Sequence, residues 1–306
     1  TGVQTCALPI YPDNLEQAHR RYPDAKYVST DYREVIDHDD VDAVIVASTN
    51  MEHRDQAVFA FEKDKHVFCE KPLHATLQGC YDILDAADRS GNVLEVGFVL
   101  RYAPTFAKVK ELIGSGEIGT PLNFHWTVHY AGGIHYFRTW HRFRKFSGGL
   151  TVEKSSHDFD LLTWFLRQYP ERVTMWASLN KFIPGTKPGE DCMTCPEPCE
   201  DRNTTVRGGV TMATPDGTGP ETASPIACYY NTPKDIPDTY VAIMDYPSGL
   251  KGTFNMCFYN SAPYYRQFDI VGSKGEIVGN IHDSRVELHK RDKNIPPEVF
   301  DLSSLS

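Results

Sequence analysis

The sequence predicts an α/β protein of two domains, in which a parallel-sheet domain is followed by an α+β domain with a large open antiparallel or mixed sheet. Three observations support this fold class. The chain has 306 residues, which is about two domains at roughly 150 residues each. Residues 11–118 alternate short apolar runs with segments of helical period, the pattern of βαβ units. After Pro121 the pattern changes to long alternating strands rich in aromatic residues.

The first domain is expected over residues 11–120. Apolar runs bounded by turn residues indicate strands, and apolar residues that recur every three or four positions indicate helices. The predicted order is a buried strand at 41–48, a helix at 53–63, a strand at 66–69, a helix at 76–89, a strand at 93–100 and a helix from 104 to 113. Gly91 is expected to end the second helix, and Pro104 suits the first turn of the third.

The second domain is expected over residues 121–306. Alternation predicts strands at 122–130 and 240–246, and a turn leads the latter into another strand at 251–259. Residues 184–237 are dense in Pro, Gly, Thr and Asp and show little periodicity. They predict a long loop insertion within this domain.

Composition excludes several classes of protein. A hydrophobic content of 41% and a charged content of 24% are ordinary for a globular domain. The net charge of -10 argues against a nucleic-acid partner. The longest apolar run, at 41–47, falls far short of the ~20 residues of a membrane span. Eight cysteines are too sparse for a disulfide scaffold, so a reducing cytoplasm is the expected compartment.

Residues 1–10 stand apart from the rest of the chain. They lack an initiator Met, a basic segment and an apolar segment, so they do not form a signal peptide. They resemble a translated sequencing adapter. We therefore expect a foreign leader in front of a first domain that is truncated at its N-terminus.

One glycine motif has the wrong surroundings for its usual role. The segment Gly114-Ser115-Gly116-Glu117-Ile118-Gly119 matches G-x-G-x-x-G. The dinucleotide fingerprint requires a strand before the glycines and a helix after them. Here the predicted helix comes first, which indicates a helix end and a turn. No second copy of the motif occurs in the sequence, so either the protein binds no dinucleotide or the glycine loop was lost upstream.

Polar residues follow two neighbouring predicted strands. Ser48-Thr49-Asn50 ends one strand, with His53 opening the next helix, and Glu70-Lys71-Pro72 follows the other strand. The carboxyl edge of an open parallel sheet is where such folds bind ligands. The alternatives are a solvated charge pair before a turn at Glu70-Lys71, and helix N-capping near His53.

A second group of polar residues lies at the start of a predicted helix. Ser155 or Ser156 is expected to be the N-cap. If the helical phase reaches back to Glu153, then Glu153, His157 and Asp160 share one face. The alternatives are a core histidine paired with a carboxylate, and a metal site made by the same three side chains.

These segments, with Gly97-Phe98, Arg101-Tyr102 and Gly148-Gly149, resemble the Gfo/Idh/MocA oxidoreductase family. The joint occurrence of Glu-Lys-Pro at 70–72 and His-x-x-Asp at 157–160 is specific to this family. The resemblance covers residues 11–166 in register. It implies a Rossmann domain that binds NAD or NADP, and a C-terminal domain whose open sheet often forms homo-oligomers. It also implies oxidation or reduction of a secondary alcohol in a sugar, polyol or inositol.

The resemblance also implies roles for single residues. Lys71 matches the active-site lysine and His157 the catalytic histidine, while Glu153 stands where many relatives have an aspartate. Lys154 beside it departs from the commoner hydrophobic residue. The cofactor-binding candidates are Ser48, Thr49, Asn50, His53, Glu70, Lys71, Pro72 and Arg101.

The residue types suit hydride transfer. A hydride leaves a carbinol carbon readily only as the hydroxyl proton departs, so the site needs a base and a cation. We expect His157 to be the base, because imidazole titrates near neutral pH. Lys71 would supply the cation. Glu153 and Asp160 are expected to orient the imidazole and favour its charged form.

Two further segments suggest binding. The aromatic and basic stretch at 130–142 could stack on a sugar ring or could equally be a packed interface. The substrate candidates are Tyr136, Trp140, Arg142 and Lys154. The thiols Cys192, Cys195 and Cys199, with the distant Cys228, suggest a structural zinc or an iron–sulfur cluster. Free or redox-paired cysteines are the alternative.

The expected function is therefore that of an NAD(P)-dependent dehydrogenase of sugars or polyols. One alternative is an NAD-dependent glycosidase, which oxidises its substrate transiently and cleaves by elimination. Another is a non-catalytic sugar-binding or scaffold protein.

Overall fold

The computed structural model describes Arg20 and residues 22–130, 133–197, 199, 227–261 and 265–305. The predicted leader at 1–10 lies outside the described residues. The chain divides into two compact units. The first contains the described residues up to Gly97 together with Lys145–Glu153, and the second contains Phe98–Arg144 and most of the remaining chain. The described part holds no helix that is both long enough and apolar enough to span a membrane.

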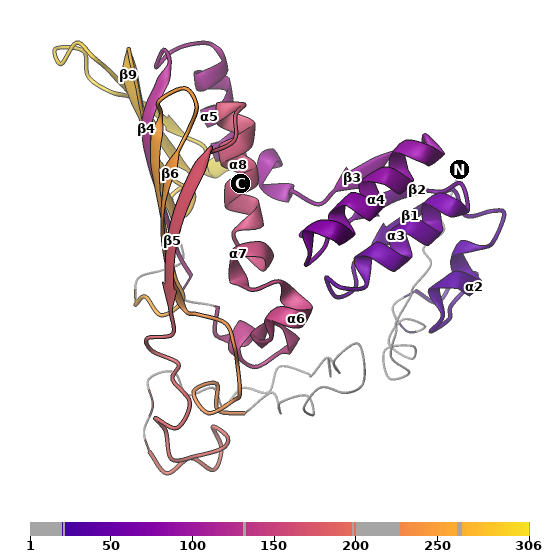
Figure 1. Cartoon of the computed structure of the whole chain (residues 1–306). Coiled ribbons are helices and arrows are strands. Elements are labelled where there is room, and N and C mark those ends of the chain that lie inside the picture. The colour runs from indigo at the N-terminus through magenta and orange to yellow at the C-terminus, as the bar shows by residue number, and fades with distance from the viewer. Residues whose placement is uncertain are drawn as a thin grey trace. The chain divides into compact units, whose positions relative to one another are not determined.

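The first unit is built on a three-stranded parallel sheet in the order β1-β2-β3. Its elements are α2 (Tyr32–Ile36), β1 (Ala43–Val46), α3 (His53–Glu62), β2 (His66–Cys69), α4 (Leu77–Ser90) and β3 (Leu94–Val96). Two successive right-handed crossovers in the same direction place their helices on the same face of a sheet. Accordingly, α3 and α4 lie side by side against the strands (Figure 1).

The core of this unit lies between the sheet and these helices. Alternate strand residues face it and are buried, among them Val44, Val46, Val67 and Cys69. On the opposite face of β1, Ile45 is 70% exposed. The prediction of a buried strand at 41–48 is therefore wrong in its length, because the strand has four residues, and it holds for only one of the two faces.

The limits of α4 follow from local chemistry. The Thr76 hydroxyl accepts a hydrogen bond from the Gly79 backbone N–H at 3.2 Å, which caps the helix start. Gly91 ends the helix with φ of +72°, a left-handed conformation that glycine adopts without strain. The predicted helix at 76–89 is confirmed.

The second unit is built on an eight-stranded sheet in the order β11-β10-β9-β8-β4-β7-β6-β5. The strands are β4 (Pro121–His129), β5 (Arg172–Ser178), β6 (Thr239–Asp245), β7 (Lys251–Cys257), β8 (Tyr265–Gly272), β9 (Gly275–Asn280), β10 (Arg285–Lys290) and β11 (Glu298–Asp301). Neighbours are antiparallel except β4 and β7, which are parallel. The predicted large open sheet is confirmed as a mixed sheet.

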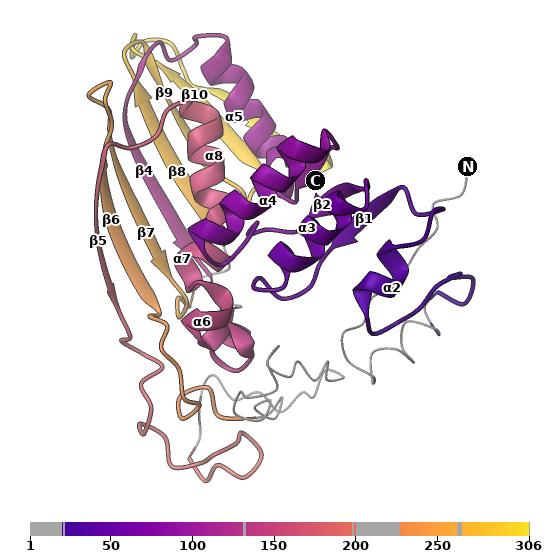
Figure 2. The same ribbon diagram turned by 45° about the vertical axis from the view of Figure 1, so that its right-hand side comes forward.

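Two helices, α5 (Pro104–Gly114) and α8 (Ser156–Leu166), cover one face of this sheet (Figure 2). Phe106 of α5 packs its ring 5.9 Å from those of both Trp126 and Phe268. Phe159 of α8 packs 5.0 Å from Phe254. These contacts bury the inward side chains of the central strands.

The glycine motif at 114–119 lies where α5 gives way to β4. Gly116 and Gly119 have φ of +78° and +69°, which a residue with a side chain adopts only with strain. The helix precedes the glycines and the strand follows them. The motif is therefore a helix end and turn, as predicted.

Short helices complete the connections. They are η1 (Val99–Tyr102), η2 (Gly133–Phe137), η3 (Trp140–Arg142), α6 (Arg144–Ser147), α7 (Leu150–Glu153) and η4 (Ser303–Leu305). The strand predicted at 93–100 covers only Leu94–Val96, and η1 begins at Val99.

The predicted insertion at 184–237 is loop wherever the structure describes it, apart from an isolated bridge between Asp191 and Ala227. The buried carboxylate of Asp238 closes this loop. It accepts the backbone N–H groups of three consecutive residues at 2.9, 2.8 and 3.1 Å, namely Asn180, Lys181 and Phe182.

Candidate active site

A lysine–carboxylate pair lies at the carboxyl end of the parallel sheet in the first unit. Lys71 Nζ donates to Glu153 Oε1 at 2.7 Å and to the Glu153 carbonyl at 3.1 Å. Asn50 Nδ2 donates to Glu153 Oε2 at 2.6 Å and to the Ser147 carbonyl at 3.1 Å. The side chains of Glu153 and Lys71 are 6% and 18% exposed. Each carboxylate oxygen therefore has a donor in a site largely shielded from water.

The sheet and one glycine turn bring these residues together. Asn50 and Lys71 follow the carboxyl ends of paired parallel strands, which lie at one edge of the sheet. Glu153 ends α7, which follows a turn at Gly148. Gly148 has φ of +77°, and a Cβ there would lie 2.9 Å from the Ala75 carbonyl oxygen. Only glycine lets this backbone approach closely enough to bring Glu153 to the edge.

The Glu70 side chain is half-buried and lies against Gly97. A Cβ on Gly97 would lie 2.9 Å from Glu70 Oε2, and the same oxygen accepts the Lys71 backbone N–H at 3.2 Å. Backbone N–H groups of Glu70 and Gly97 bond to Val46 and Cys69, each at 2.8 Å. Glu70 thus joins the ends of the three strands.

The His53 side chain is buried next to the same edge of the parallel sheet. It is 1% exposed, with Nδ1 2.9 Å from the Pro72 carbonyl and Nε2 3.2 Å from the Ser48 carbonyl. Burial lowers its pKa. The Ser48 hydroxyl donates to Gln56 Oε1 at 2.9 Å. Both residues were expected at a cofactor. The His53 side chain instead links the segments that follow β1 and β2, and the Ser48 side chain bonds to α3.

The buried side-chain hydroxyl of Thr49 is suited to binding a ligand. The residue is 6% exposed, and its Oγ1 is buried with no hydrogen-bond partner among the described residues. A buried hydroxyl without a partner costs about 1–3 kcal/mol. A polar cofactor at this edge would satisfy it, so the residues present fit such a group.

His157 lies in the first turn of α8, in the second unit. Its ring stands edge-on to Phe98, 6.3 Å between centroids. The proposed shared face of Glu153, His157 and Asp160 is wrong, because α7 ends at Glu153 and α8 begins at Ser156. Ser155 precedes α8, but its side chain makes no capping bond and contacts Met256 Sδ at 3.2 Å instead.

Asp160 and Arg101, predicted for different roles, pair with each other. Arg101 donates through Nε and Nη2 to the two carboxylate oxygens at 2.8 and 2.5 Å. Its guanidinium also lies 5.9 Å from the Phe98 ring and 5.7 Å from the Trp164 ring. This bidentate pair fixes α8 against η1.

A buried network beside His157 was missed from the sequence. The Asp158 side chain is fully buried, and its Oδ1 accepts from Trp126 Nε1 at 2.9 Å and from Arg266 Nε at 2.6 Å. Arg266 occupies an inward position in β8, in phase with Phe268 and Ile270. A charged residue at an inward position of an alternating strand was the signal that could have revealed this pair.

The three substrate candidates within the aromatic stretch at 130–142 are buried. Tyr136, Trp140 and Arg142 are 6%, 6% and 3% exposed. Trp140 stacks on His141 at 3.8 Å, and burial lowers the pKa of Arg142. Their burial within the chain leaves these three side chains little surface to offer a sugar ring. The remaining substrate candidate, Lys154, places its Nζ 3.9 Å from the centre of the Tyr130 ring.

The four candidate metal ligands lie around one cavity of about 10 Å³. They are Cys192, Cys195, Cys199 and Cys228, all free thiols. Across the described ranges, no three Cys, His, Asp or Glu side chains are arranged to hold a metal ion. The predicted metal site is therefore not formed in this structure, and neither is one at Glu153, His157 and Asp160.

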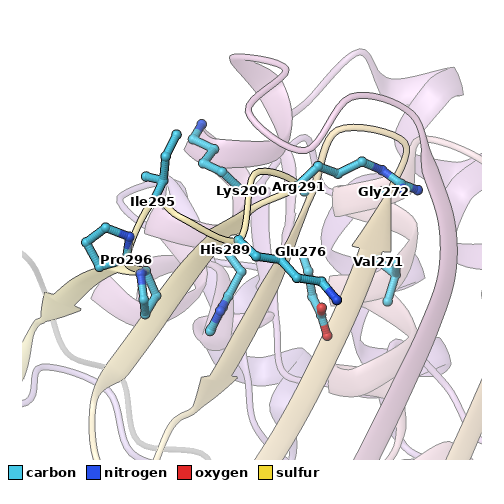
Figure 3. Close-up of a pocket in the computed structure, with 11 residues that line it drawn as sticks. Val271, Gly272, Glu276, His289, Lys290, Arg291, Ile295 and Pro296 are labelled. Atoms are coloured by element: carbon cyan, nitrogen blue, oxygen red, sulfur yellow. The ribbon is translucent and has the colours of Figure 1, made fainter.

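A larger cavity of about 510 Å³ opens at one end of the eight-stranded sheet. Figure 3 shows Glu276 and His289, from neighbouring strands, beneath the loop that carries Ile295 and Pro296. None of the predicted site residues lines it.

Comparison with known proteins identifies the family. Residues 5–98 match the model of an oxidoreductase family with an NAD-binding Rossmann fold, and residues 106–278 match that of the GFO/IDH/MocA C-terminal domain. "Putative oxidoreductase YteT" of Bacillus subtilis is 32% identical over 90% of this chain and 70% of its own length. The inositol 2-dehydrogenase of Salmonella typhimurium is 33% identical over 58% of this chain, which spans 51% of that protein.

Solved structures agree on the fold. A levoglucosan dehydrogenase in complex with NADH and levoglucosan has a TM-score of 0.75 at 21% identity, covering 98% of this chain and 71% of its own. The myo-inositol 2-dehydrogenase of Lactobacillus plantarum has a TM-score of 0.66 at 19% identity, covering 90% and 68%. The two matching domain models and the 32% identity to YteT show that the chain belongs to the Gfo/Idh/MocA oxidoreductase family.

Proposed function

We propose that this protein is an NAD(P)-dependent dehydrogenase that acts on a secondary alcohol of a sugar, polyol or inositol. The observation that carries the proposal is the shielded Lys71–Glu153 pair at the carboxyl edge of the parallel sheet. Family membership and the names of the relatives support the same activity.

The cofactor would be held at this edge by residues after β1 and β2. Thr49 supplies the buried hydroxyl that lacks a partner among the described residues, and Lys71 supplies a positive charge. When bound, the nicotinamide ring accepts or returns the hydride.

Lys71 is placed to hold a developing alkoxide. An ammonium group has three N–H donors, and two of them reach Glu153. The third can donate to a substrate oxygen. Glu153 holds the ammonium group in place, and Asn50 holds Glu153 in turn.

His157 is our proposed base. It follows Glu153 by four residues in the sequence, and an imidazole is the side chain that most often acts as a general base. The Asp158 contacts with Trp126 and Arg266 immobilise the turn that carries it.

Net formation of reduced nicotinamide tests the proposal. The chain would be incubated with NAD⁺ or NADP⁺ and a panel of inositols, sugars and alditols. We expect turnover with at least one polyol and a loss of about 10²–10⁴-fold in Lys71→Met and in His157→Asn. Lys63→Met, whose partner is the exposed Asp37 in the same unit, is the matched control and should keep full activity. Full activity in both site variants would refute the assignment.

The same assay separates the alternatives. A glycosidase that oxidises transiently would cleave a glycoside without net reduced nicotinamide. A scaffold protein would give neither product nor cleavage. The names of the relatives favour the dehydrogenase.

We also propose that the outward face of the eight-stranded sheet joins copies of this chain. Trp176 of β5 pairs in register with Val241 of β6, and these residues with Ile243 are 61%, 40% and 51% exposed on that face. An exposed apolar strip of this kind favours association. Trp176→Glu should lower the molar mass measured by light scattering, and an unchanged mass would refute this interface.

A further inference from the structure

The two edge strands of the eight-stranded sheet differ in how well they are protected. β11 forms one edge of the sheet and β5 forms the other (Figure 2). The backbone N–H and C=O groups on the outer side of an edge strand can pair with a further strand unless something blocks them. Natural edge strands are blocked by short length, by proline, by charged residues or by a bulge.

β11 carries three of these protective features. It has only four residues, and its first and last residues are the charged Glu298 and Asp301. Pro296 and Pro297 come directly before it. This edge is therefore poorly suited to pairing with another strand.

β5 lacks nearly all of them. Its seven residues pair with β6 without a shift in register and include no proline. Its single charged residue, Arg172, stands at the first position and is paired with Asp245 of β6. All seven residues are exposed. Across the described ranges, the backbone bonds of β5 run only to β6 and to the neighbouring Asp238, which leaves the other side of the strand open.

β5 also presents apolar side chains on both of its faces. Trp176, opposite Val241, lies on the outward face of the sheet and is 61% exposed. Met175 lies opposite the buried Ala242, on the face that α5 and α8 cover further along the sheet, yet it is 37% exposed. Val173, on the same face as Met175, is 53% exposed. An exposed strand with this composition favours pairing with another chain.

A second copy of the same strand fits this edge in an antiparallel arrangement. Two strands that continue one sheet keep their faces aligned, so a two-fold axis between identical strands sets one residue opposite its own copy. If that residue is Met175, the middle of the strand, all seven residues of each copy are paired. Val173 then lies opposite the partner subunit's Ala177, apolar against apolar. The two Arg172 side chains lie at opposite ends of the pair, so no like charges meet.

We propose that β5 is an interface at which two copies of this chain pair antiparallel, with Met175 opposite its own copy, so that the two eight-stranded sheets continue into one. This contact is distinct from the one proposed above for the outward face, because Met175 points to the opposite side of the sheet. It goes beyond the dehydrogenase activity and does not depend on it.

Charge changes at the two-fold axis test the pairing. Met175→Lys and Met175→Glu each set two like charges opposite each other in a pair of identical chains, whereas a mixture of the two variants sets opposite charges together. We expect each variant alone to have about half the molar mass of the unaltered chain by light scattering, and an equimolar mixture to regain the full mass. Val299→Lys adds a charge at a 46% exposed position of β11, so it is the matched control and should keep the full mass.

An unchanged mass in both variants, or a mixture that stays at the lower mass, would overturn this interface. A mass that falls in Trp176→Glu but not in Met175→Lys would support the outward face and refute the β5 edge.

Hydrogen exchange of the unaltered chain covers the case in which the variants fail to fold. The amides of residues 172–178 that point away from β6 should exchange about tenfold more slowly in concentrated protein than in dilute protein, because pairing protects them. Exchange at the same rate in both would overturn the proposal.

Discussion

The Lys71–Glu153 pair makes a quantitative prediction for Glu153→Gln. The two charged atoms lie 2.7 Å apart, which corresponds to an attraction of about 6 kcal/mol at an effective dielectric constant of about 20. A glutamine has one acceptor oxygen where the carboxylate has two, yet both Lys71 and Asn50 donate to this group. One donor would therefore face the amide NH₂.

Removing one partner of a buried ion pair typically costs about 3–5 kcal/mol. Because the Lys71 side chain is 18% exposed, water recovers part of this, and we expect a loss of about 3 kcal/mol. At about 2–4 °C per kcal/mol, the melting temperature should fall by about 6–12 °C. Differential scanning calorimetry measures the shift.

Asp245→Asn is the matched control. Asp245 also pairs with two cations, Arg172 and Lys251, but their side chains are 77% and 57% exposed. Water and salt screen exposed pairs strongly, so the control should lower the melting temperature by much less than Glu153→Gln does. Equal shifts in the two variants would refute the conclusion that Glu153 holds a shielded charge.

Three further predictions concern the rest of the chain. Asp158→Asn should destabilise the protein by about 3–5 kcal/mol in urea unfolding, whereas Asp158→Leu combined with Arg266→Met should cost less than the sum of the two single changes; additive costs would contradict the network. Gly114→Ala adds a Cβ that meets no atom within 4 Å, so it should stabilise the protein by about 0.5–1 kcal/mol. Gly252→Ala adds a Cβ that would lie 2.0 Å from the Phe124 ring, so it should destabilise the protein. A Gly252→Ala protein more stable than the unaltered one would show that the ring moves freely. Burial lowers the pKa of His53 below its ordinary 6.5, so the unfolded chain binds the proton first and stability falls as pH drops through 6.5. His53→Gln should flatten that slope, and an unchanged slope would assign it to other groups.

Local patterns were sufficient to predict most of the fold. The strand at 66–69 and the helices at 53–62 and 104–114 follow from apolar periodicity and clear end signals such as Pro104. The strand at 41–48 was predicted too long. The first residues of the loop that follows it are also compatible with a strand, so the sequence does not mark where the strand ends. Its burial was overestimated because an apolar run does not show how many faces a sheet covers.

The site was predictable only in part. Lys71 and Glu153 were identified separately, but their pairing depends on a turn at Gly148 that brings together positions 82 residues apart. The helix break after Glu153 gives no periodic signal, since Lys154 and Ser155 are compatible with a helix. Arg266 lies 108 residues from Asp158, so no local pattern links them.

Transfer of deuterium tests the central claim most directly. A polyol that the chain oxidises would be labelled with deuterium at its carbinol carbon and incubated with the oxidised cofactor. The dehydrogenase we propose would move the label to the nicotinamide ring in a one-to-one ratio with the ketone formed, and Lys71→Met and His157→Asn would slow this transfer while Lys63→Met would not. Label lost to solvent, or a nicotinamide that stays oxidised while substrate is consumed, would contradict it.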